Sequence, residues 1–333
     1  VGIGLKAAGG TTTGASNIAI GTNSLLQNTT GALNVAVGSY ALNANTTAAN
    51  NTAVGHSALT ANTTGSENVA IGAQAGDAIT TGANNISIGY MALGAETTGG
   101  RSVAIGRNAL LVQNFTGDEL PYNVGVGYGA GAAVTTGINN TLIGGLAGDA
   151  LTDADFNVAL GSLALSSDTL GSRSVALGYG TLTAQNFTSA TDAYNTAVGT
   201  LAGLSVTTGV RNTIIGGLAG DALTDADNNV VMGYLALSAD TLGSRSVAIG
   251  KGALTTQNFT SATDTYNTAV GYNAGKAVTT GIKNTILGGL AGDAITTGDT
   301  NVALGYAALS ANTTADNNTA VGTSALAANT TGA

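Results

Sequence analysis

The sequence predicts an all-β fold, a repetitive β-solenoid of 19 coils with about 17 residues in each, over a single continuous domain of residues 1–333. Three observations support this fold. A short motif recurs in phase along the whole chain, and one of its positions is Gly in every copy. Gly, Thr, Asn and Val also recur too densely for a sustained helical period.

The motif is the pentapeptide Asn-(Val/Thr)-Ala-(Val/Ile/Leu)-Gly, and its spacing divides the chain into coils. The spacing is 17 residues except for three intervals of 21, which lie 72 residues apart and impose a super-repeat of four coils. The long coils are residues 102–122, 174–194 and 246–266. After a partial first copy that starts at Val1, the motifs begin at Asn17, Asn34, Asn51, Asn68, Asn85, Ser102, Asn123, Asn140, Asn157, Ser174, Asn195, Asn212, Asn229, Ser246, Asn267, Asn284, Asn301 and Asn318.

Each coil is predicted to contain a strand, a Gly bend, a short strand and a polar turn. Counting the leading Asn or Ser as position 1, position 5 is Gly in all 19 copies. Position 8 is a small residue, and position 9 is Leu or Gly except at Ala8. The coil closes with segments such as residues 62–65, Asn-Thr-Thr-Gly, whose residues favour turns. A coil this short indicates a flattened, two-sided roll.

Both faces of the predicted strand are apolar. Side chains alternate along a strand, so Val35 and Val37 share one face and Ala36 takes the other. We expect the Val face to point into the roll, and other subunits to cover the Ala face, because strands apolar on both faces are covered on both. The alternative is a monomeric solenoid with a flat, Ala-rich wet face. The predicted oligomer seam is Ala36, Ala53, Ala70, Ala104, Ala176 and Ala248.

The repeats resemble a known family. Residues 102–106 and 246–250 read Ser-Val-Ala-Ile-Gly and residues 51–55 read Asn-Thr-Ala-Val-Gly, similar to the head repeats of YadA-like trimeric autotransporter adhesins. Related repeats occur in phage tail fibres and bacterial fibre-like surface proteins. The resemblance covers nearly the whole chain and implies a left-handed parallel β-roll, a homotrimeric fibre, and adhesion outside the cell. The coils are slightly longer than in those heads, and no segment resembles their stalk, neck, membrane anchor or chaperone.

Composition excludes several classes of function. The net charge of −9, from nine Lys and Arg against 18 Asp and Glu, supplies no basic surface for nucleic acid. No apolar run is long enough for a membrane helix. The chain has no Cys, no phosphate-binding loop and a single His, His56, without a nearby partner for catalysis. We therefore expect a protein that is not an enzyme, with no cofactor and no membrane insertion within this segment.

Acidic clusters offer weak candidates for calcium, because carboxylates on a turn can bind this ion. Their spacing fits neither an EF-hand nor the nonapeptide calcium repeat, so solvated turns are the main interpretation. In addition, Glu96, Asp168 and Asp240 each precede an Arg by five residues, which predicts ion pairs across the turn or between chains. The calcium candidates are Asp149, Asp153, Asp155, Asp221, Asp225 and Asp227.

The loops of the long coils are the main candidates for ligand contact. Each contains Gln-Asn-Phe-Thr and ends in Tyr, and successive loops are expected about 19 Å apart, at four strand spacings. The rings either stack on a surface glycan or plug the roll where the loop departs. Frequent Asn-x-Thr sequons are explained by turn chemistry or, in a secreted chain, by glycosylation. The candidate loop residues are Phe115, Tyr122, Phe187, Tyr194, Phe259 and Tyr266.

These features predict an extracellular structural or adhesive fibre, at a cell surface or on a virion. One alternative is a self-assembling extracellular filament without a receptor, and another is an ice-binding solenoid with a Thr ladder. Val1 and Ala333 both fall within the repeat pattern, so we expect these residues to be part of a longer array in which neither end is capped.

Overall fold

The computed structural model describes residues 1–117, 119–330 and 332 and confirms the predicted fold class. It is a parallel β-solenoid of about 19 coils with about 17 residues per turn, and its described residues form no helix. Nothing in this part of the chain could cross a membrane as a helix. Contacts divide the chain into two compact units, Val1–Ser162 and Leu163–Ala333. Whether residues 1–333 act as one domain stays a prediction, and Thr331 and Ala333 lie outside the described residues.

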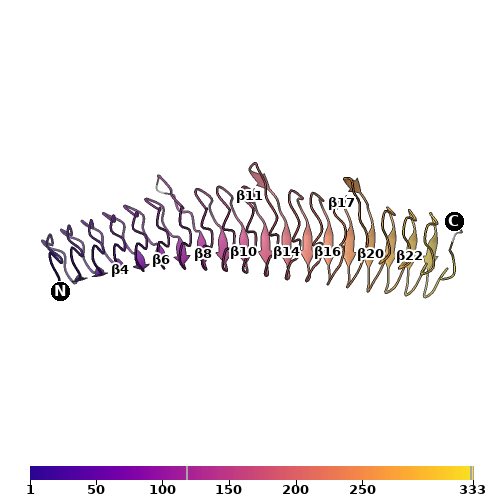
Figure 1. Cartoon of the computed structure of the whole chain (residues 1–333), viewed down its shortest axis with the longest axis horizontal. Helices are drawn as coiled ribbons and strands as arrows, with labels where there is room; N and C mark the ends of the chain where they lie inside the picture. The colour runs from indigo at the N-terminus through magenta and orange to yellow at the C-terminus, as the bar shows by residue number, and fades with distance from the viewer. Residues whose placement is uncertain (118, 331, 333) are drawn as a thin grey trace. The chain divides into compact units, whose positions relative to one another are not determined.

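The first unit contributes one short strand from each coil (Figure 1). Consecutive strands pair in parallel and in register, as where Ala36 lies opposite Ala53. Parallel pairing in register stacks equivalent positions of successive coils into columns. The strands are β1 (Gly2–Ile3), β2 (Ile18–Ile20), β3 (Val35–Val37), β4 (Thr52–Val54), β5 (Val69–Ile71), β6 (Ile86–Ile88), β7 (Val103–Ile105), β8 (Val124–Val126), β9 (Thr141–Ile143) and β10 (Val158–Leu160).

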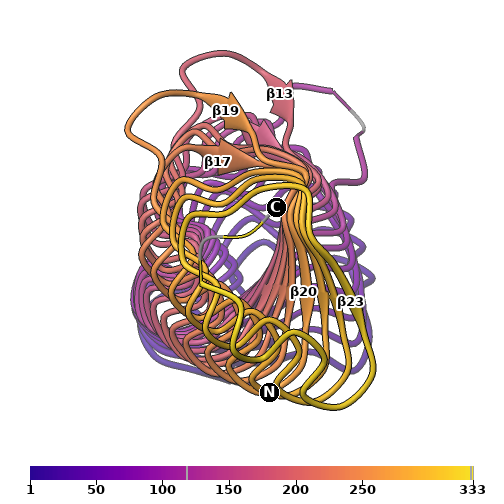
Figure 2. The same ribbon diagram turned by 90° about the vertical axis from the view of Figure 1, so that its right-hand side faces the viewer.

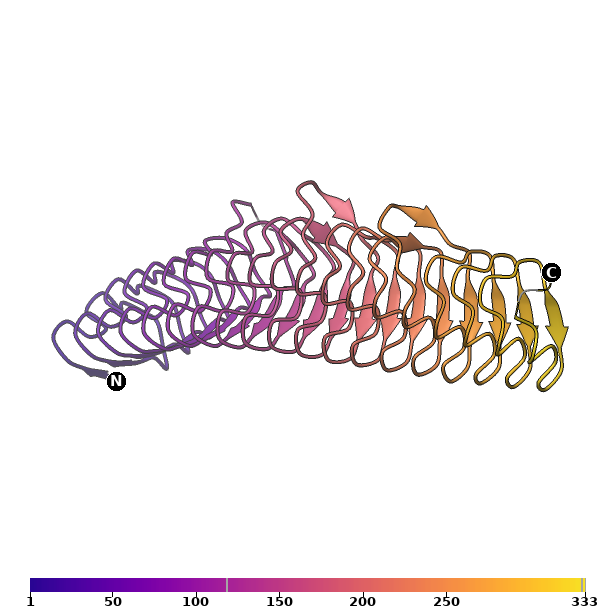
Figure 3. The same ribbon diagram turned by 45° about the vertical axis from the view of Figure 1, so that its right-hand side comes forward.

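The second unit repeats this arrangement, with its principal strands side by side (Figure 3). They are β12 (Val175–Leu177), β14 (Thr196–Val198), β15 (Thr213–Ile215), β16 (Val230–Met232), β18 (Val247–Ile249), β20 (Thr268–Val270), β21 (Thr285–Leu287), β22 (Val302–Leu304) and β23 (Thr319–Val321). Two small parallel pairs lie at its loops: β11 (Gly171–Ser172) with β13 (Thr191–Asp192), and β17 (Gly243–Ser244) with β19 (Thr263–Asp264). Figure 2 shows the loops of β13 and β19 projecting from the same edge.

The prediction of a short strand after the Gly bend is wrong. This segment is a run of turns in which positions 7 and 9 adopt left-handed backbone conformations, as at Tyr40 (φ 62°) and Leu42 (φ 50°). The coils still form a ladder there, because the amide of Leu42 donates to the carbonyl of Ala58 at 3.0 Å. The wall opposite the sheet is therefore hydrogen-bonded from coil to coil without being regular β-structure.

The predicted facing of the strand is also wrong. The residues proposed as an oligomer seam are fully buried within the single chain, so they cannot contact another subunit. Val35 and Val37 are only partly buried and form the outer face. The side chain of the leading Asn34 lies on the same side of the strand as Ala36, and it must reach acceptors inside the coil. Positions 2 and 4 lie on the other side of the strand and therefore point outward. The corrected residues, all 0% exposed, are Ala36, Ala53, Ala70, Ala104, Ala176 and Ala248.

The leading Asn side chains form an internal ladder. The Asn34 side-chain amide donates to the carbonyl of Ala48 in its own coil at 2.8 Å. Its Oδ1 atom accepts from the backbone amide of Asn51 in the next coil at 2.9 Å. A second ladder includes Asn45, which donates to Oδ1 of Asn28 at 2.8 Å. Asn28 and Asn45 are fully buried, so the sequons at these positions serve turn chemistry in the folded coil.

The core contains a size exchange between positions 9 and 12. In every coil after the first, Leu at position 9 accompanies a polar residue at position 12, and Gly accompanies Ile, Val or Leu. A Cβ atom added at Gly76 would lie 2.9 Å from Cδ1 of Ile79, which fills that space. Ile79 also ends the second Asn ladder, because Oδ1 of Asn62 is buried without a partner.

We expect this exchange to be energetically coupled in a double-mutant cycle. Gly76→Leu alone overpacks the coil, at a cost of about 1–3 kcal/mol, and Ile79→Asn alone removes a buried apolar side chain. In the double variant, the introduced leucine occupies the space that Ile79 vacated, and the introduced asparagine can donate to Asn62. Chemical denaturation should give a cost for the double variant at least about 1 kcal/mol below the sum of the single costs. Additive costs would contradict the exchange.

Candidate functional site

Each long coil is built around a buried carboxylate in the preceding coil. Oδ1 of Asp240 accepts from the amides of Gly243 at 3.0 Å and Phe259 at 3.1 Å. Its Oδ2 accepts from Nε2 of Gln257 at 2.6 Å. The same Gln257 nitrogen donates to Oγ of Ser246 at 2.9 Å, and Asn267 donates to the Gln257 oxygen at 2.8 Å. The carboxylate thus holds the turn at the point where the loop leaves the coil.

The other two long coils repeat this arrangement. Asp168 accepts from Gly171, Phe187 and Gln185, and Gln185 also donates to Ser174. In the first unit, Glu96 accepts from Thr97, Gly99, Phe115 and Gln113, with distances between 2.7 and 3.2 Å. The sequence contained a signal for these networks, since Ser replaces the leading Asn and Gln occupies position 12 only in long coils. We define the carboxylate hubs as Glu96, Asp168 and Asp240 with Gln113, Gln185 and Gln257.

The two aromatic rings of each loop have different roles. Phe115, Phe187 and Phe259 are 5–7% exposed and therefore plug the coil, as one of the two interpretations predicts. The Tyr rings remain half exposed and available for contact. They are Tyr122, Tyr194 and Tyr266, with 47%, 51% and 51% of their surface exposed.

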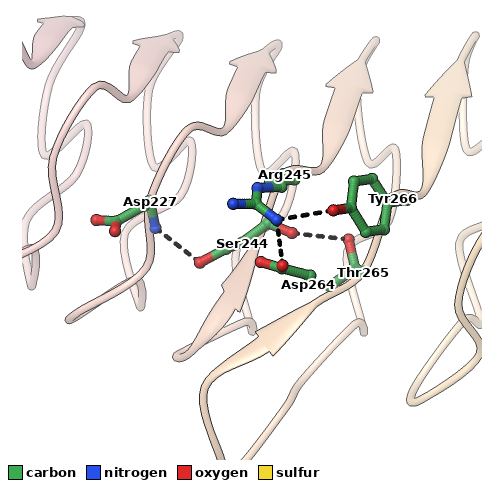
Figure 4. A network of polar contacts seen from close by, with 6 residues as sticks. All are labelled: Asp227, Ser244, Arg245, Asp264, Thr265 and Tyr266. Atoms are coloured by element: carbon green, nitrogen blue, oxygen red, sulfur yellow. Dashed lines mark hydrogen bonds and ion pairs between the residues drawn. The ribbon is translucent and has the colours of Figure 1, made fainter.

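The predicted ion pairs across the turn are wrong, because the carboxylates are inside the coil and the Arg side chains are outside. Figure 4 shows that Arg245 contacts Asp264 and Tyr266. Arg245 donates to the Tyr266 hydroxyl at 2.7 Å, and its guanidinium lies 5.6 Å from the centre of the Tyr ring. The hydrogen bond to the Tyr266 hydroxyl and, after it, the charge of Asp264 raise the pKa of Arg245, because both favour the charged form.

The same Arg–Tyr contact occurs at the other long coils. Arg173 pairs with Asp192 at 2.9 Å and lies over Tyr194, and Arg101 donates to the Tyr122 hydroxyl at 2.6 Å. These exposed contacts hold the end of each loop against the coil. One side of each Tyr ring is occupied by Arg, which limits its use as a stacking surface.

The calcium candidates are not brought together. Asp153 accepts from the Thr136 hydroxyl at 2.6 Å, and Asp155 accepts from the amide of Ile138 at 2.8 Å. Asp149 lies six residues before Asp155, at position 10. Oδ1 of Asp149 is buried without a hydrogen-bond partner, and burial raises the pKa of this group.

The second acidic cluster has the same arrangement. Asp225 accepts from Thr208, Asp227 accepts from the amide of Val210, and burial raises the pKa of Asp221. Among the described residues, no three or more His, Cys, Asp or Glu side chains converge on a possible metal position. The Asp side chains instead bridge neighbouring coils.

Two further sequence hypotheses can be compared with the structure. His56 is exposed and meets the ring of Tyr40 edge-on, with 6.2 Å between ring centres, as expected for a surface turn residue.

The ice-binding hypothesis needs free hydroxyl groups on a Thr ladder. In the first unit, Thr29, Thr46 and Thr63 at position 13 donate theirs to the carbonyl of the next coil.

Comparison with family models, with curated proteins and with solved structures finds no match to this chain. The resemblance to adhesin heads and tail fibres therefore stays a prediction.

Proposed function

We propose that this chain is a non-enzymatic, extracellular structural and adhesive fibre shaft whose copies associate through the outer face of their strands. The observation that carries this proposal is the composition of that face. Positions 2 and 4 of every coil are Val, Ile, Leu, Met or Thr, and no position on the face is charged. We call these residues the outer strip.

The side chains of the outer strip are partly exposed, and several are more than a third exposed. In the first unit, Ile71 is 40% exposed and Leu160 is 46% exposed, and in the second unit Leu304 is 42% exposed. Contiguous apolar surface of this kind marks interaction sites, and parallel sheets are normally covered on both faces. The occupant that best fits is another copy of the chain, because an identical strip has the same period from coil to coil.

The edges of the strip favour the same proposal. Position 6 on one side and position 17 on the other include Tyr, Arg and Lys, such as Tyr90, Arg107, Arg101 and Lys251. Tyr and Arg are enriched in protein interfaces, which combine an apolar centre with a polar rim. The projecting loops with Tyr122, Tyr194 and Tyr266 offer a further surface for contact with a cell-surface glycan or receptor.

The test is the oligomeric mass of a strip variant. In the triple variant Val37→Asp, Val54→Asp, Ile71→Asp, a homo-oligomer would have to bury three unpaired charges per copy, which is costly. The control places the same charges in the same three coils but at exposed position 14, as Thr47→Asp, Thr64→Asp, Thr81→Asp. Light scattering should show the strip variant as a folded monomer and the control with the parent mass. An unchanged mass for the strip variant would contradict the proposal.

A further inference from the structure

A row of exposed Tyr rings lies just beyond the Gly bends of the second unit, outside the outer strip. Tyr234, Tyr272 and Tyr306 all occupy position 6 of their coils and are 51–57% exposed. They follow β16, β20 and β22, so one coil separates each Tyr from the next. We call these three residues the tyrosine row.

The spacing of the tyrosine row is fixed by the backbone. The amides of Gly252, Asn273, Leu290 and Ala307 each donate to the position-6 carbonyl of the preceding coil, at 2.9–3.1 Å. Every coil between the Tyr residues is therefore locked to its neighbour. At about 4.8 Å per coil, the Cα atoms of successive Tyr residues lie about 10 Å apart.

The residues between the Tyr residues leave room for the rings. A Cβ atom added at Gly289 would lie 3.7 Å from Cδ2 of Tyr306, and one added at Gly217 would lie 3.7 Å from Cδ2 of Tyr234. Each of these rings thus leans over the preceding coil, where a Gly removes the competing side chain. Lys251 occupies position 6 of the coil before Tyr272, and its Nζ lies 5.7 Å from the centre of the Tyr272 ring. The rings of Tyr234 and Tyr306 accordingly follow the stacking direction of the coils, and Tyr272 lies between them at the same position of its coil.

We propose that the tyrosine row binds an extended, β-1,4-linked polysaccharide lying along the stack of coils. Successive sugars of such a chain are turned over relative to one another, so every second sugar presents the same apolar face. The disaccharide repeat matches two coils, which places one sugar face on each Tyr ring. Lys251 lies between the first two rings and can donate hydrogen bonds to sugar hydroxyls. The tyrosine row lies at position 6, on the edge of the outer strip, and its sugar binding is measured separately from the assembly proposed for that strip.

The same unit contains a matched control for the spacing. Tyr179 also occupies position 6 and is 53% exposed, but it lies three coils before Tyr234. A chain in register with the tyrosine row would present the opposite sugar face at this odd spacing. Tyr179 therefore has the same exposed ring as the tyrosine row, but its distance from the row does not match the disaccharide repeat.

The test is calorimetric titration of the intact protein with β-1,4-linked glucose and N-acetylglucosamine oligosaccharides of three to six sugars. Because the row extends over four coil spacings, affinity should rise steeply until about five sugars are present. Tyr272→Ala should weaken binding of at least one hexasaccharide on the order of tenfold. Tyr179→Ala should leave the affinity unchanged. The helical α-1,4-linked glucose hexasaccharide should bind weakly or not at all.

Several results would overturn the proposal. They are absence of binding by both β-linked series, affinity independent of length, equal binding of the α-linked chain, or equal loss in the two Tyr variants. Light scattering on the same samples separates this site from the assembly. If Tyr272→Ala changes the oligomeric mass while the parent binds no oligosaccharide, the row belongs to an interface and the polysaccharide proposal fails.

Discussion

Gly55→Val is expected to unfold the coil that contains it, with a loss of more than about 3 kcal/mol. Gly55 has a φ of +140°, which residues with a side chain rarely adopt. A Cβ atom there would lie 2.6 Å from the carbonyl carbon of Gly72, an atom of the backbone that cannot rotate away. The same contact recurs between Gly bends along each unit, so the bends approach one another too closely for any side chain.

Hydrogen exchange and thermal melting together can measure this effect. Because each coil contacts mainly its neighbours, lost protection should be concentrated in residues 51–72 and fade within a few coils. Gly145→Val is the control, since a Cβ atom there meets only Oγ of Ser162, at 3.9 Å. Melting curves of Gly55→Val that match those of the parent would show that the position requires only a small residue.

The fold could be predicted from the sequence because the repeat restricts it so strongly. A motif at fixed spacing with an invariant Gly leaves few alternatives to a solenoid. The facing of the strand was more difficult, since both faces are apolar and alternation alone does not say which is inside. The leading Asn residues show which face is inside, because Asn34 must be buried to complete its ladder and Ala36 lies on the same side of the strand.

The carboxylate hubs could not be predicted from pairing rules. Asp240 lies five residues before Arg245, a spacing that favours an ion pair on an exposed turn. Asp240 occupies position 12, where the side chain points into the coil. Its carboxylate must therefore find hydrogen-bond donors inside the coil. The four inserted residues of the long coil remove the regular turn that would otherwise use these donors. The only sequence feature that indicated this network was shared by the long coils, which have Ser at position 1 and Gln at position 12.

The hubs explain how the solenoid accepts loops without losing its register. A loop that leaves the coil exposes backbone amides that ordinary coils satisfy through the turn. In the long coil of residues 246–266, Asp240 accepts from the amide of Phe259, and Gln257 reconnects the network to Asn267 in the following coil. The Phe259 ring fills the opening, while Arg245 and Tyr266 close it from outside. Loops can therefore vary in their exposed residues while the coil beneath them remains fixed.

Asp240→Ala is expected to cost about 3 kcal/mol or more, because three buried donors lose the carboxylate that accepts their hydrogen bonds. These donors are the amides of Gly243 and Phe259 and Nε2 of Gln257, although the last retains its bond to Ser246. Asp240→Asn should cost less, since its Oδ1 can still accept from the two amides.

The matched control is Asp264→Asn, which removes a carboxylate from the same loop on the solvent side. Its ion pair with Arg245 is nearly half exposed, so the loss should be far smaller than that of Asp240→Ala. Chemical denaturation measures the three variants, and hydrogen exchange at Gly243 and Phe259 locates the effect. Equal costs for Asp240→Ala and Asp264→Asn would show that the buried carboxylate does not hold the loop, and that the Phe259 ring and the outer Arg–Tyr contact are sufficient to do so.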